Sequence, residues 1–305
     1  MTSVAVPLYE HFENGTLTLD FLQEHKDEIM TAARRQRLRN PLVWLAMETR
    51  TVGQHTLSIL LQCARMVMHV CPELLRVPDV VGLTVVHDAA RWCWDEKMLE
   101  LIMTHEMADI NGKDQVDYRP LHYAAVIGNV PAMKQLIKLG ADIEAPTHVL
   151  FDKFTPLYFS LQHPKAVSLL LGAKASATWT GENGLTLLHC VPEDIRDEDV
   201  AIETARMLLM AGAGLEATDS EGRTPADRAA SMDRKKLLAW LRRAELRPIV
   251  PSNKWRPSSH WLCCKEVRDA VYGGMLVANR NRTLPLELWF CIFELLPVFL
   301  HADVH

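Results

Sequence analysis

The residues nearest in type and spacing to a metal site are His260, Cys263 and Cys264. Imidazole nitrogen and thiolate sulfur are the ligands that zinc prefers in proteins. The two cysteines are adjacent, however, and adjacent side chains do not readily face one tetrahedral ion. A Cys-x-x-Cys pair, the usual partner of such a histidine, is absent from the sequence. We therefore predict no metal site and no cofactor.

Three further histidines, His87, His122 and His189, could act as general bases by type alone. The sequence contains no Gly-x-Ser-x-Gly, no His-Glu-x-x-His, no Walker phosphate loop and no Gly-x-Gly-x-x-Gly beside them. The acidic run at residues 193–199 lacks a basic or nucleophilic partner in the sequence, and we interpret it as a solvated loop. We predict that the protein is not an enzyme.

These histidines stand at one position of a short segment that recurs along the chain. The segment occurs at residues 82–90, 119–125, 155–160, 184–190 and 222–230. Within each segment the helix-start pattern begins at one residue: Thr84, Arg119, Thr155, Thr186 and Thr224. The gaps between them are 35, 36, 31 and 38 residues, with a mean of 35. A period of this length is typical of stacked repeats, in which each unit buries its apolar face only against its neighbours.

Each segment has the residue types of a helix start. Thr caps the first amides of a helix, and Pro at the next position needs no hydrogen-bond donor. Pairs of alanine allow a short inner helix to pack closely, and about ten residues later an apolar stripe at helical spacing predicts a second helix. The stripes lie at residues 98–102, 133–137, 166–171 and 205–209. Gly140, Gly172 and Gly212 follow them, and we expect each to supply the left-handed residue after the second helix.

The Thr-Pro or Thr-Leu step followed by Leu-His-x-Ala, with Gly-Ala-Asp-Ile at residues 140–143, resembles the ankyrin repeat over residues 84–245. The resemblance implies an all-α solenoid of about five or six helix-turn-helix units. It also implies that the recurring histidine bonds the turn of its own repeat. The third unit departs from the pattern, because Tyr158 replaces that histidine and the alanine pair is missing.

The flanking sequence suggests four regions. Residues 1–78 are predicted to be a helical N-terminal cap, with Asn40-Pro41-Leu42 faintly resembling one degenerate repeat start, and residues 79–247 to be the ankyrin repeats. Prolines 248, 251 and 257 mark residues 248–282 as a linker. Residues 283–305 form a separate C-terminal segment.

That segment has an apolar stripe at helical spacing, beginning with a proline at residue 285 and ending at another at residue 297. It resembles the opening of an F-box, which binds the Skp-type adaptor of cullin–RING ubiquitin ligases, although it is shorter than a full F-box. Under this resemblance the adaptor-binding residues are Leu284, Pro285, Leu288, Ile292 and Leu295. A SOCS-type box that recruits elongin is a second interpretation. A plain helix that caps the repeats is a third.

Aromatic residues occupy the predicted hairpin loops, where polar residues would be the norm. We interpret Tyr118, Phe151, Phe154 and Trp179 as anchors for a client protein on the concave face of the ankyrin array. Trp92 and Trp94 lie at the turn between two predicted helices, and we expect one of them to be buried.

Composition narrows the class of protein. Hydrophobic residues make up 49% of the 305-residue chain, and 33 basic against 38 acidic residues leave a net charge of −5. Mild acidity argues against nucleic acid as a partner. The apolar residues 284–300 include Glu287 and Glu294, which argues against a membrane span. The first fifteen residues lack the features of a secretory signal, and the seven cysteines form no disulfide pattern, so we expect a cytoplasmic or nuclear monomer.

Two functions then remain open. In the first, the protein is a substrate-recognition adaptor: the ankyrin array holds a client, and the C-terminal segment recruits a ubiquitin ligase through a Skp-type adaptor or elongin. In the second, it is a plain ankyrin scaffold or inhibitor whose last helix only caps the array.

Overall fold

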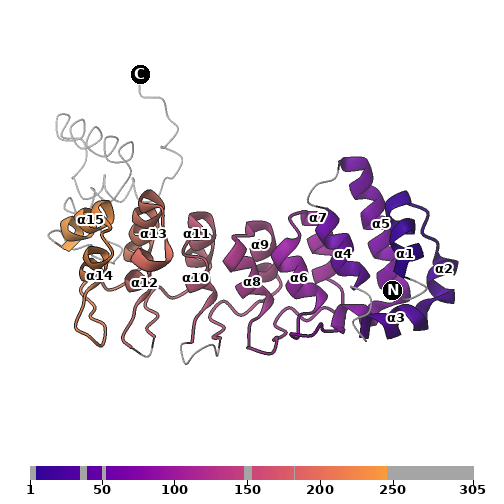
Figure 1. Cartoon of the computed structure of the whole chain (residues 1–305), viewed down its shortest axis with the longest axis horizontal. Helices are drawn as coiled ribbons and strands as arrows, with labels where there is room; N and C mark the ends of the chain where they lie inside the picture. The colour runs from indigo at the N-terminus through magenta and orange to yellow at the C-terminus, as the bar shows by residue number, and fades with distance from the viewer. Residues whose placement is uncertain (1–4, 35–39, 50–52, 148–152, 182, 246–305) are drawn as a thin grey trace, which may run out of the picture. The chain divides into compact units, whose positions relative to one another are not determined.

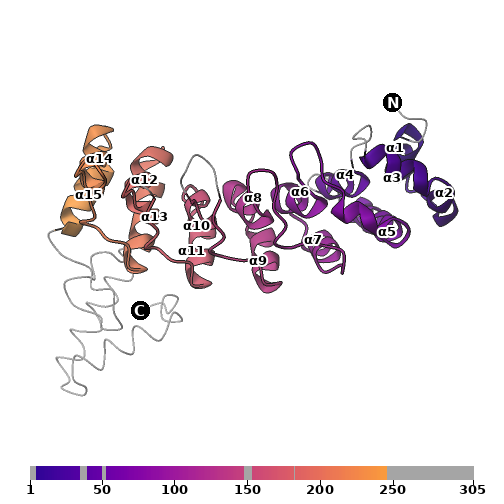
Figure 2. The same cartoon turned by 90° about the horizontal axis from the view of Figure 1, so that it is seen from below.

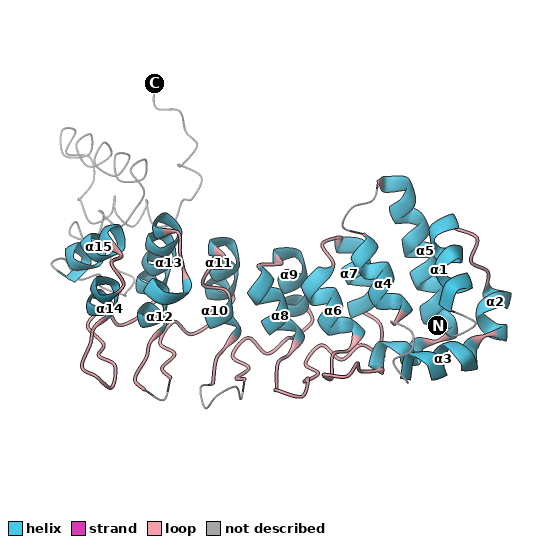
Figure 3. Cartoon of the chain, in the orientation of Figure 1, coloured by secondary structure: helices cyan, strands magenta, loops and turns pink. Residues whose placement is uncertain are grey.

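The computed structural model describes residues 5–34, 40–49, 53–147, 153–181 and 183–245 (Figure 1). The chain forms two compact units, Met1–Glu182 and Asn183–His305. In the described residues the regular structure is helical throughout, without a strand (Figure 3). The all-α prediction is therefore confirmed for this part of the chain. The predicted linker at 248–282 and the C-terminal segment at 283–305 lie outside the described residues.

The first unit begins with five helices and a short 3-10 helix, followed by three helix pairs. The initial elements are α1 (Ala5–Asn14), α2 (Leu19–Glu24), α3 (Lys26–Arg34), α4 (Pro41–Glu48), α5 (Gln54–Val70) and η1 (Pro72–Arg76). The pairs are α6 (Val85–Trp92) with α7 (Glu96–Met103), α8 (Pro120–Ile127) with α9 (Val130–Lys138), and α10 (Pro156–Phe159) with α11 (Pro164–Gly172).

These three pairs stack in two rows. Helices α6, α8 and α10 pack side by side in an inner row, and α7, α9 and α11 pack in an outer row (Figures 1 and 2). The loops that connect an outer helix to the next inner helix project from the inner row, at the lower edge of Figure 1. Helix α4 packs on α6, and α5 contacts α7, so the same arrangement continues toward the N-terminus.

The inner helices begin where the cap chemistry predicts. Thr84 and Thr155 are in extended N-cap conformations, with φ and ψ of −94° and 172° and of −94° and 165°. Pro120 follows the N-cap Arg119 at the first position of α8, and Pro156 follows Thr155 at the first position of α10. The alanine pairs are fully buried, and α6 packs on α8 through the inner row that contains them (Ala89, Ala90, Ala124, Ala125).

Buried Asn129 joins two neighbouring pairs. Its Oδ1 accepts from the amide of Ala132 at 3.2 Å, which caps α9. Its Nδ2 donates to the carbonyls of Ala90 and Cys93 at 3.0 and 2.6 Å, which belong to the end of α6 and the turn after it. The side chain thus satisfies backbone groups that packing would otherwise leave unpaired.

Helix α10 is one short turn, and the sequence explains why. Twelve residues separate Leu121 from Met133, but only ten separate their counterparts Leu157 and Val167. The missing residues come out of the inner helix, which has four residues in α10 and eight in α8. The aromatic residues of this short helix, Tyr158 and Phe159, therefore lie close to the hairpin that precedes it.

The second unit has two helix pairs of the same kind. They are α12 (Leu187–Asp194) with α13 (Glu198–Met210), and α14 (Pro225–Ser231) with α15 (Lys235–Glu245). Helix α12 packs on α14, and α13 packs on α15. The acidic run at residues 193–199 was predicted to be a solvated loop, but only residues 195–197 lie outside a helix. The others end α12 and begin α13, where Asp197 caps the helix by accepting from the amides of Asp199 and Val200.

Candidate protein-binding surface

Three buried histidines hold the hairpins against the inner helices. His87, His122 and His189 each accept a backbone N–H at Nδ1, from Thr84, Arg119 and Thr186 at 3.0–3.1 Å. Their Nε2 atoms donate to carbonyls of the following hairpin: Gly112 and Tyr118, Ala145, and Arg223. The predicted bond to the turn of the same repeat is therefore present, and a second bond to the next hairpin accompanies it.

This geometry keeps the imidazoles neutral. Burial lowers the pKa of His122 to about 4, and it lowers the pKa of His87 and His189 below the usual value. Both ring nitrogens are occupied, so neither is available to a substrate or a metal. The three histidines are structural residues that fix the loops in place.

The third repeat, formed by α10 and α11, lacks this histidine. Tyr158 stands where the histidine would be, and its ring stacks on Phe154 with 4.1 Å between ring centroids. The hydroxyl of Thr155, the N-cap of this repeat, is buried and has no hydrogen-bond partner. The repeat thus lacks a local structural bond and gains an aromatic contact.

Six aromatic side chains from successive hairpins and inner helices form a continuous set of ring contacts. We call this set the aromatic row: Tyr118, Tyr123, Phe154, Tyr158, Phe159 and Trp179. From one end to the other, the ring centroids are 5.6 Å apart between Tyr123 and Tyr118, 5.1 Å between Tyr118 and Phe159, 6.0 Å between Phe159 and Phe154, and 5.3 Å between Phe154 and Trp179.

All six rings are partly exposed. Tilted and offset contacts at 4.5–7 Å are favourable between aromatic rings, so the row supports itself and leaves ring surface open to solvent. The indole N–H of Trp179 donates to the carbonyl of Lys153 at 2.7 Å, which fixes the last ring across two hairpins. Preorganised aromatic surface of this kind binds another protein with little loss of side-chain entropy.

A buried carboxylate positions the other end of the row. Asp114 accepts from the amides of Val116 and Tyr118 at Oδ1, and from the hydroxyl of Tyr123 at Oδ2, at 2.6 Å. Burial and the neighbouring Asp114 raise the pKa of both tyrosines, so both remain neutral. Two rings of the row are therefore oriented by one hairpin.

A cation lies beside the same end. The guanidinium of Arg91 is 4.6 Å from the ring of Trp92 and 5.8 Å from the ring of Tyr123. We expected one of Trp92 and Trp94 to be buried, and this is wrong: Trp92 is half-buried under Arg91, and Trp94 is 38% exposed.

The structure brings three of the four predicted anchor residues together. Tyr118, Phe154 and Trp179 all belong to the aromatic row, while Phe151 lies outside the described residues. The predicted ligase-adaptor residues also lie outside them (Leu284, Pro285, Leu288, Ile292, Leu295). The sequence interpretation missed Tyr123 and Phe159, which immediately follow the histidine position of their segments. The sequence does contain a signal for them, because an aromatic residue occupies this same position in both segments.

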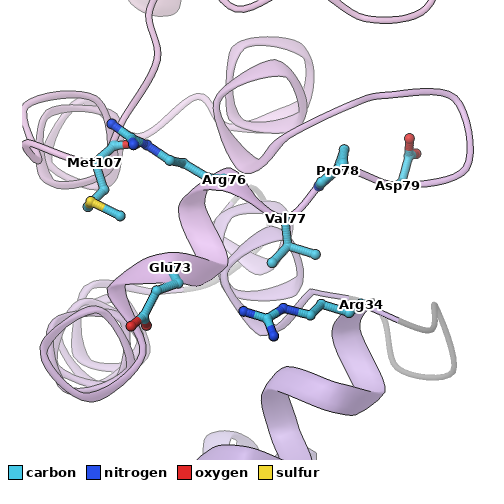
Figure 4. A pocket seen from close by; sticks show the side chains of 7 residues that line it. All are labelled: Arg34, Glu73, Arg76, Val77, Pro78, Asp79 and Met107. Atoms are coloured by element: carbon cyan, nitrogen blue, oxygen red, sulfur yellow. The ribbon is translucent and has the colours of Figure 1, made fainter.

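An open depression of about 480 Å³ lies between α3, η1 and the start of the first hairpin (Figure 4). Its lining residues are Arg34, Glu73, Arg76, Val77, Pro78, Asp79 and Met107. Arg76 donates from Nε to the carbonyl of Met107 at 3.1 Å, and Glu73 is 3.9 Å from the ammonium of Lys26. Two arginines and two carboxylates line the depression, and this balance favours no particular class of ligand.

The described part of the chain holds neither a cluster of metal-binding side chains nor a helix suited to a membrane. No group of three or more His, Cys, Asp or Glu side chains there could hold a metal ion. Within the same residues, no helix combines the length and apolar character that a membrane crossing requires. His260, Cys263 and Cys264, for which the sequence predicts no metal site, lie outside the described residues.

Comparison with known proteins gives the class of the repeats. Residues 86–178 match the family described as ankyrin repeats (3 copies). Alpha-latrotoxin-Lg1a from Latrodectus geometricus is 31% identical over 111 residues, and alpha-latrotoxin-Lt1a from Latrodectus tredecimguttatus is 29% identical over 111 residues. Each alignment covers 35% of this chain and only 8% of the toxin, so the chain matches less than a tenth of these curated relatives.

Residues 86–178 are therefore ankyrin repeats, which make this part of the chain a protein–protein interaction module. Five of the six rings of the aromatic row lie within the matched residues, and Trp179 directly follows them.

Proposed function

We propose that this protein is a non-enzymatic recognition protein whose aromatic row holds a segment of a client protein. The observation that carries the proposal is the continuous contact of six partly exposed rings over three successive hairpins. An exposed aromatic surface of this extent is costly in water unless a partner covers it, and Tyr and Trp are frequent anchors of protein interfaces.

The described cysteines support the absence of catalysis. Cys63, Cys71, Cys93 and Cys190 are buried. Burial raises the pKa of Cys71 and Cys93 to about 11, so their thiols are protonated at neutral pH and are poor nucleophiles.

We extend the repeat assignment to the second unit. His189 makes the same pair of bonds as His87 and His122. In the last pair Asp227 takes over the role, because its Oδ2 accepts from the amide and the hydroxyl of Thr224 at 2.9 and 2.8 Å. Two repeats in the second unit and three in the first give five, and the α4–α5 pair is the candidate for a sixth.

Whether a bound client is presented to a ubiquitin ligase depends on the C-terminal segment. The resemblance of residues 283–305 to an F-box supports an adaptor role, in which the segment binds a Skp-type adaptor, or elongin under the SOCS-type interpretation. The client on the aromatic row would then be presented to a ubiquitin ligase. The alpha-latrotoxins indicate no role for this chain, because each alignment covers only 8% of the toxin.

The test is affinity purification from cells with three versions of the full chain. Tyr158→Ala combined with Trp179→Ala removes the exposed end of the aromatic row, and Trp94→Ala removes an exposed aromatic residue outside it. We expect the client to be lost with the double variant and retained with Trp94→Ala. Retention of every partner by a folded double variant would exclude the row as the binding site.

A fourth version that ends at residue 282 separates the two roles. The adaptor proposal predicts that Skp-type adaptor or elongin, together with cullin, is lost while the client is kept. If no ligase subunit is recovered with the full chain, or if recovery is unchanged by the truncation, the segment is only a cap and the protein is a scaffold.

A further inference from the structure

Among the described residues, three hairpin tips are built in the same way. Asp79, Asp114 and Asp219 each accept two backbone N–H groups at Oδ1, from the second and fourth residues that follow. The third residue after each aspartate has a positive φ: 90° at Gly82, 63° at Asp117 and 75° at Gly222. The aspartate and the left-handed residue therefore define the turn.

The two residues between them are free to vary, and they vary in polarity. The tip in the second unit carries Ser220 and Glu221, both exposed. The equivalent residues of the first tip are Val80 and Val81, which are 67% and 47% exposed, and the second tip carries Val116, which is 51% exposed. Because the same turn forms with Ser and Glu, the fold does not require valine at these positions.

The two apolar tips lie against each other. The amide of Gln115 donates to the carbonyl of Val81 at 3.2 Å, and its side chain donates to the carbonyl of Val80 at 2.9 Å. A Cβ on Gly82 would lie 2.9 Å from the amide nitrogen of Gln115, so the two backbones are in close contact. We call Val80, Val81 and Val116 the valine tips.

The second valine tip and the aromatic row share one hairpin. Tyr118 follows Val116 by two residues in the same hairpin, and the amides of both are bound to Asp114. The ring of Tyr118 then contacts Tyr123 and Phe159 of the row. A partner that contacts Tyr118 therefore lies beside the hairpin that carries Val116.

Several charges around this surface are paired within the protein, while the guanidinium of Arg91 lies over the rings of Trp92 and Tyr123. Lys113 contacts Asp117 at 2.7 Å, and Arg119 contacts Asp142 at 2.9 Å. Asp79 and Asp114 are bound to backbone amides, and Asp114 also to Tyr123. A charged partner segment would have to break these pairs or lose its own hydration without compensation, whereas an apolar segment would not.

We propose that the valine tips are a second contact region for the client and that the client segment covering them and the adjoining rings is uncharged and apolar. This inference rests on the proposed function, because it assigns the chemistry and the reach of the partner held by the aromatic row. A basic segment attracted by the ring faces is the competing chemistry, and the experiment below separates the two.

The probe is a random peptide library of about twelve residues, displayed on phage and selected on the full chain. A selected peptide is synthesised with a fluorescent label, and its Kd is measured by anisotropy. We expect enrichment of aliphatic, aromatic and proline residues. We also expect the Kd to change less than about threefold between roughly 0.05 and 0.5 M NaCl, because few ions are released.

The variant Val80→Ser with Val81→Glu transfers the residues of the polar tip to the first tip, and we expect it to weaken binding about tenfold or more. Its matched control, Ser220→Val with Glu221→Val, should leave the Kd within about twofold. If the first variant melts at a lower temperature than the parent chain, Val116→Gln alone provides the same test in the second tip.

Each contrary outcome is specific. Enrichment of Lys- and Arg-rich peptides with steep salt dependence, or no enrichment at all, overturns the apolar assignment. A Kd unchanged by the tip variants, but raised by Tyr158→Ala with Trp179→Ala, overturns the role of the tips and leaves the aromatic row as the site. Binding that needs the valines but not the rings would instead refute the row.

Discussion

Gly128 and His163 are in direct contact between neighbouring repeats. Gly128 ends α8 with a φ of 69°, and a Cβ at this position would lie 2.5 Å from Cγ of the His163 imidazole. The same imidazole donates from Nε2 to the carbonyl of Val126 at 3.0 Å, which pairs a carbonyl in the last turn of α8. The close packing of the third repeat on the second therefore depends on the absence of a side chain at residue 128.

Gly128→Ala should destabilise the protein by about 2–5 kcal/mol. A left-handed conformation costs an L-residue about 1–2 kcal/mol, and displacing a packed ring adds about 1–3 kcal/mol. Chemical denaturation of the full chain measures the loss. Gly140→Ala is the control, because Gly140 has a φ of 84° but no atom within 4 Å of the Cβ position. It should cost only the backbone term, and equal losses at the two positions would contradict the steric argument.

Local chemistry made the helix starts predictable. Thr84, Pro120 and Pro156 act within one or two residues of where they stand in the sequence, so their effect is visible without a fold. The acidic run was misread for the opposite reason. Its partners are Arg228, which contacts Glu193 at 3.2 Å, and Lys236, which contacts Asp199 at 3.4 Å, and both lie more than thirty residues away.

The left-handed residues after the outer helices were predicted only in part. Gly140 and Gly212 have φ values of 84° and 97°, as expected. Gly172 does not take this conformation, because the residue equivalent to Gly140 is Lys174: it follows Val167 by seven residues, as Gly140 follows Met133. Gly172 is the last residue of α11, and Lys174 has the positive φ, at 71°. The Leu-Gly step at residues 171–172 resembles that at residues 139–140, and only the three-dimensional alignment separates them.

Lys174→Gly should therefore stabilise the protein by about 1 kcal/mol, because glycine removes the strain of a left-handed side chain. Lys174 is exposed, so little packing is lost. Thermal or urea denaturation provides the measurement. Lys165→Gly in α11 is the control: glycine inside a helix costs about 1 kcal/mol, so the sign should reverse. A loss of stability at residue 174 would contradict the prediction.

The three buried histidines predict a pH dependence. Their pKa is lowered in the folded protein, to about 4 for His122, so the unfolded chain binds more protons between about pH 6.5 and pH 4. Stability should be complete above about pH 6.5 and fall as the pH approaches 4, with His122 alone contributing about 3 kcal/mol of the loss. Urea midpoints measured across this range give the slope.

His122→Gln tests the assignment. An amide can accept from Arg119 and donate to Ala145, as His122 does at 3.0 and 2.9 Å, but it takes up no proton. The variant should be less stable at pH 7 and show a shallower fall toward acid. A pH slope identical to that of the parent chain would assign the acid sensitivity to other groups.

The aromatic row could be foreseen only at its hairpin members. Tyr118, Phe154 and Trp179 stand out because polar residues are usual in such loops. Tyr123 and Phe159 stand on inner helices, where an aromatic residue is ordinary, and only the stacking of one repeat on the next brings them to the same surface. Their contact is set by the repeat geometry, which the sequence of a single repeat does not contain.

Tyr158 is the position at which stability and recognition should separate. Histidine there would give the buried hydroxyl of Thr155, and its amide, the acceptor that Thr84 and Thr186 find in their own repeats. A satisfied buried hydroxyl contributes about 1 kcal/mol. The same change removes the ring that stacks on Phe154 at 4.1 Å and contacts Trp179 at 6.0 Å.

Tyr158→His should therefore raise the urea midpoint and weaken binding of the client or the selected peptide about tenfold. Tyr158→Phe is the matched control, because it keeps the stacked ring and gains no acceptor, and it should change neither quantity strongly. Selection for stability alone favours histidine at this position, as in three other repeats of the chain. If Tyr158→His gains stability and keeps full affinity, the tyrosine ring has no part in binding. A gain of stability with a loss of affinity would explain why this repeat carries tyrosine where its neighbours carry histidine.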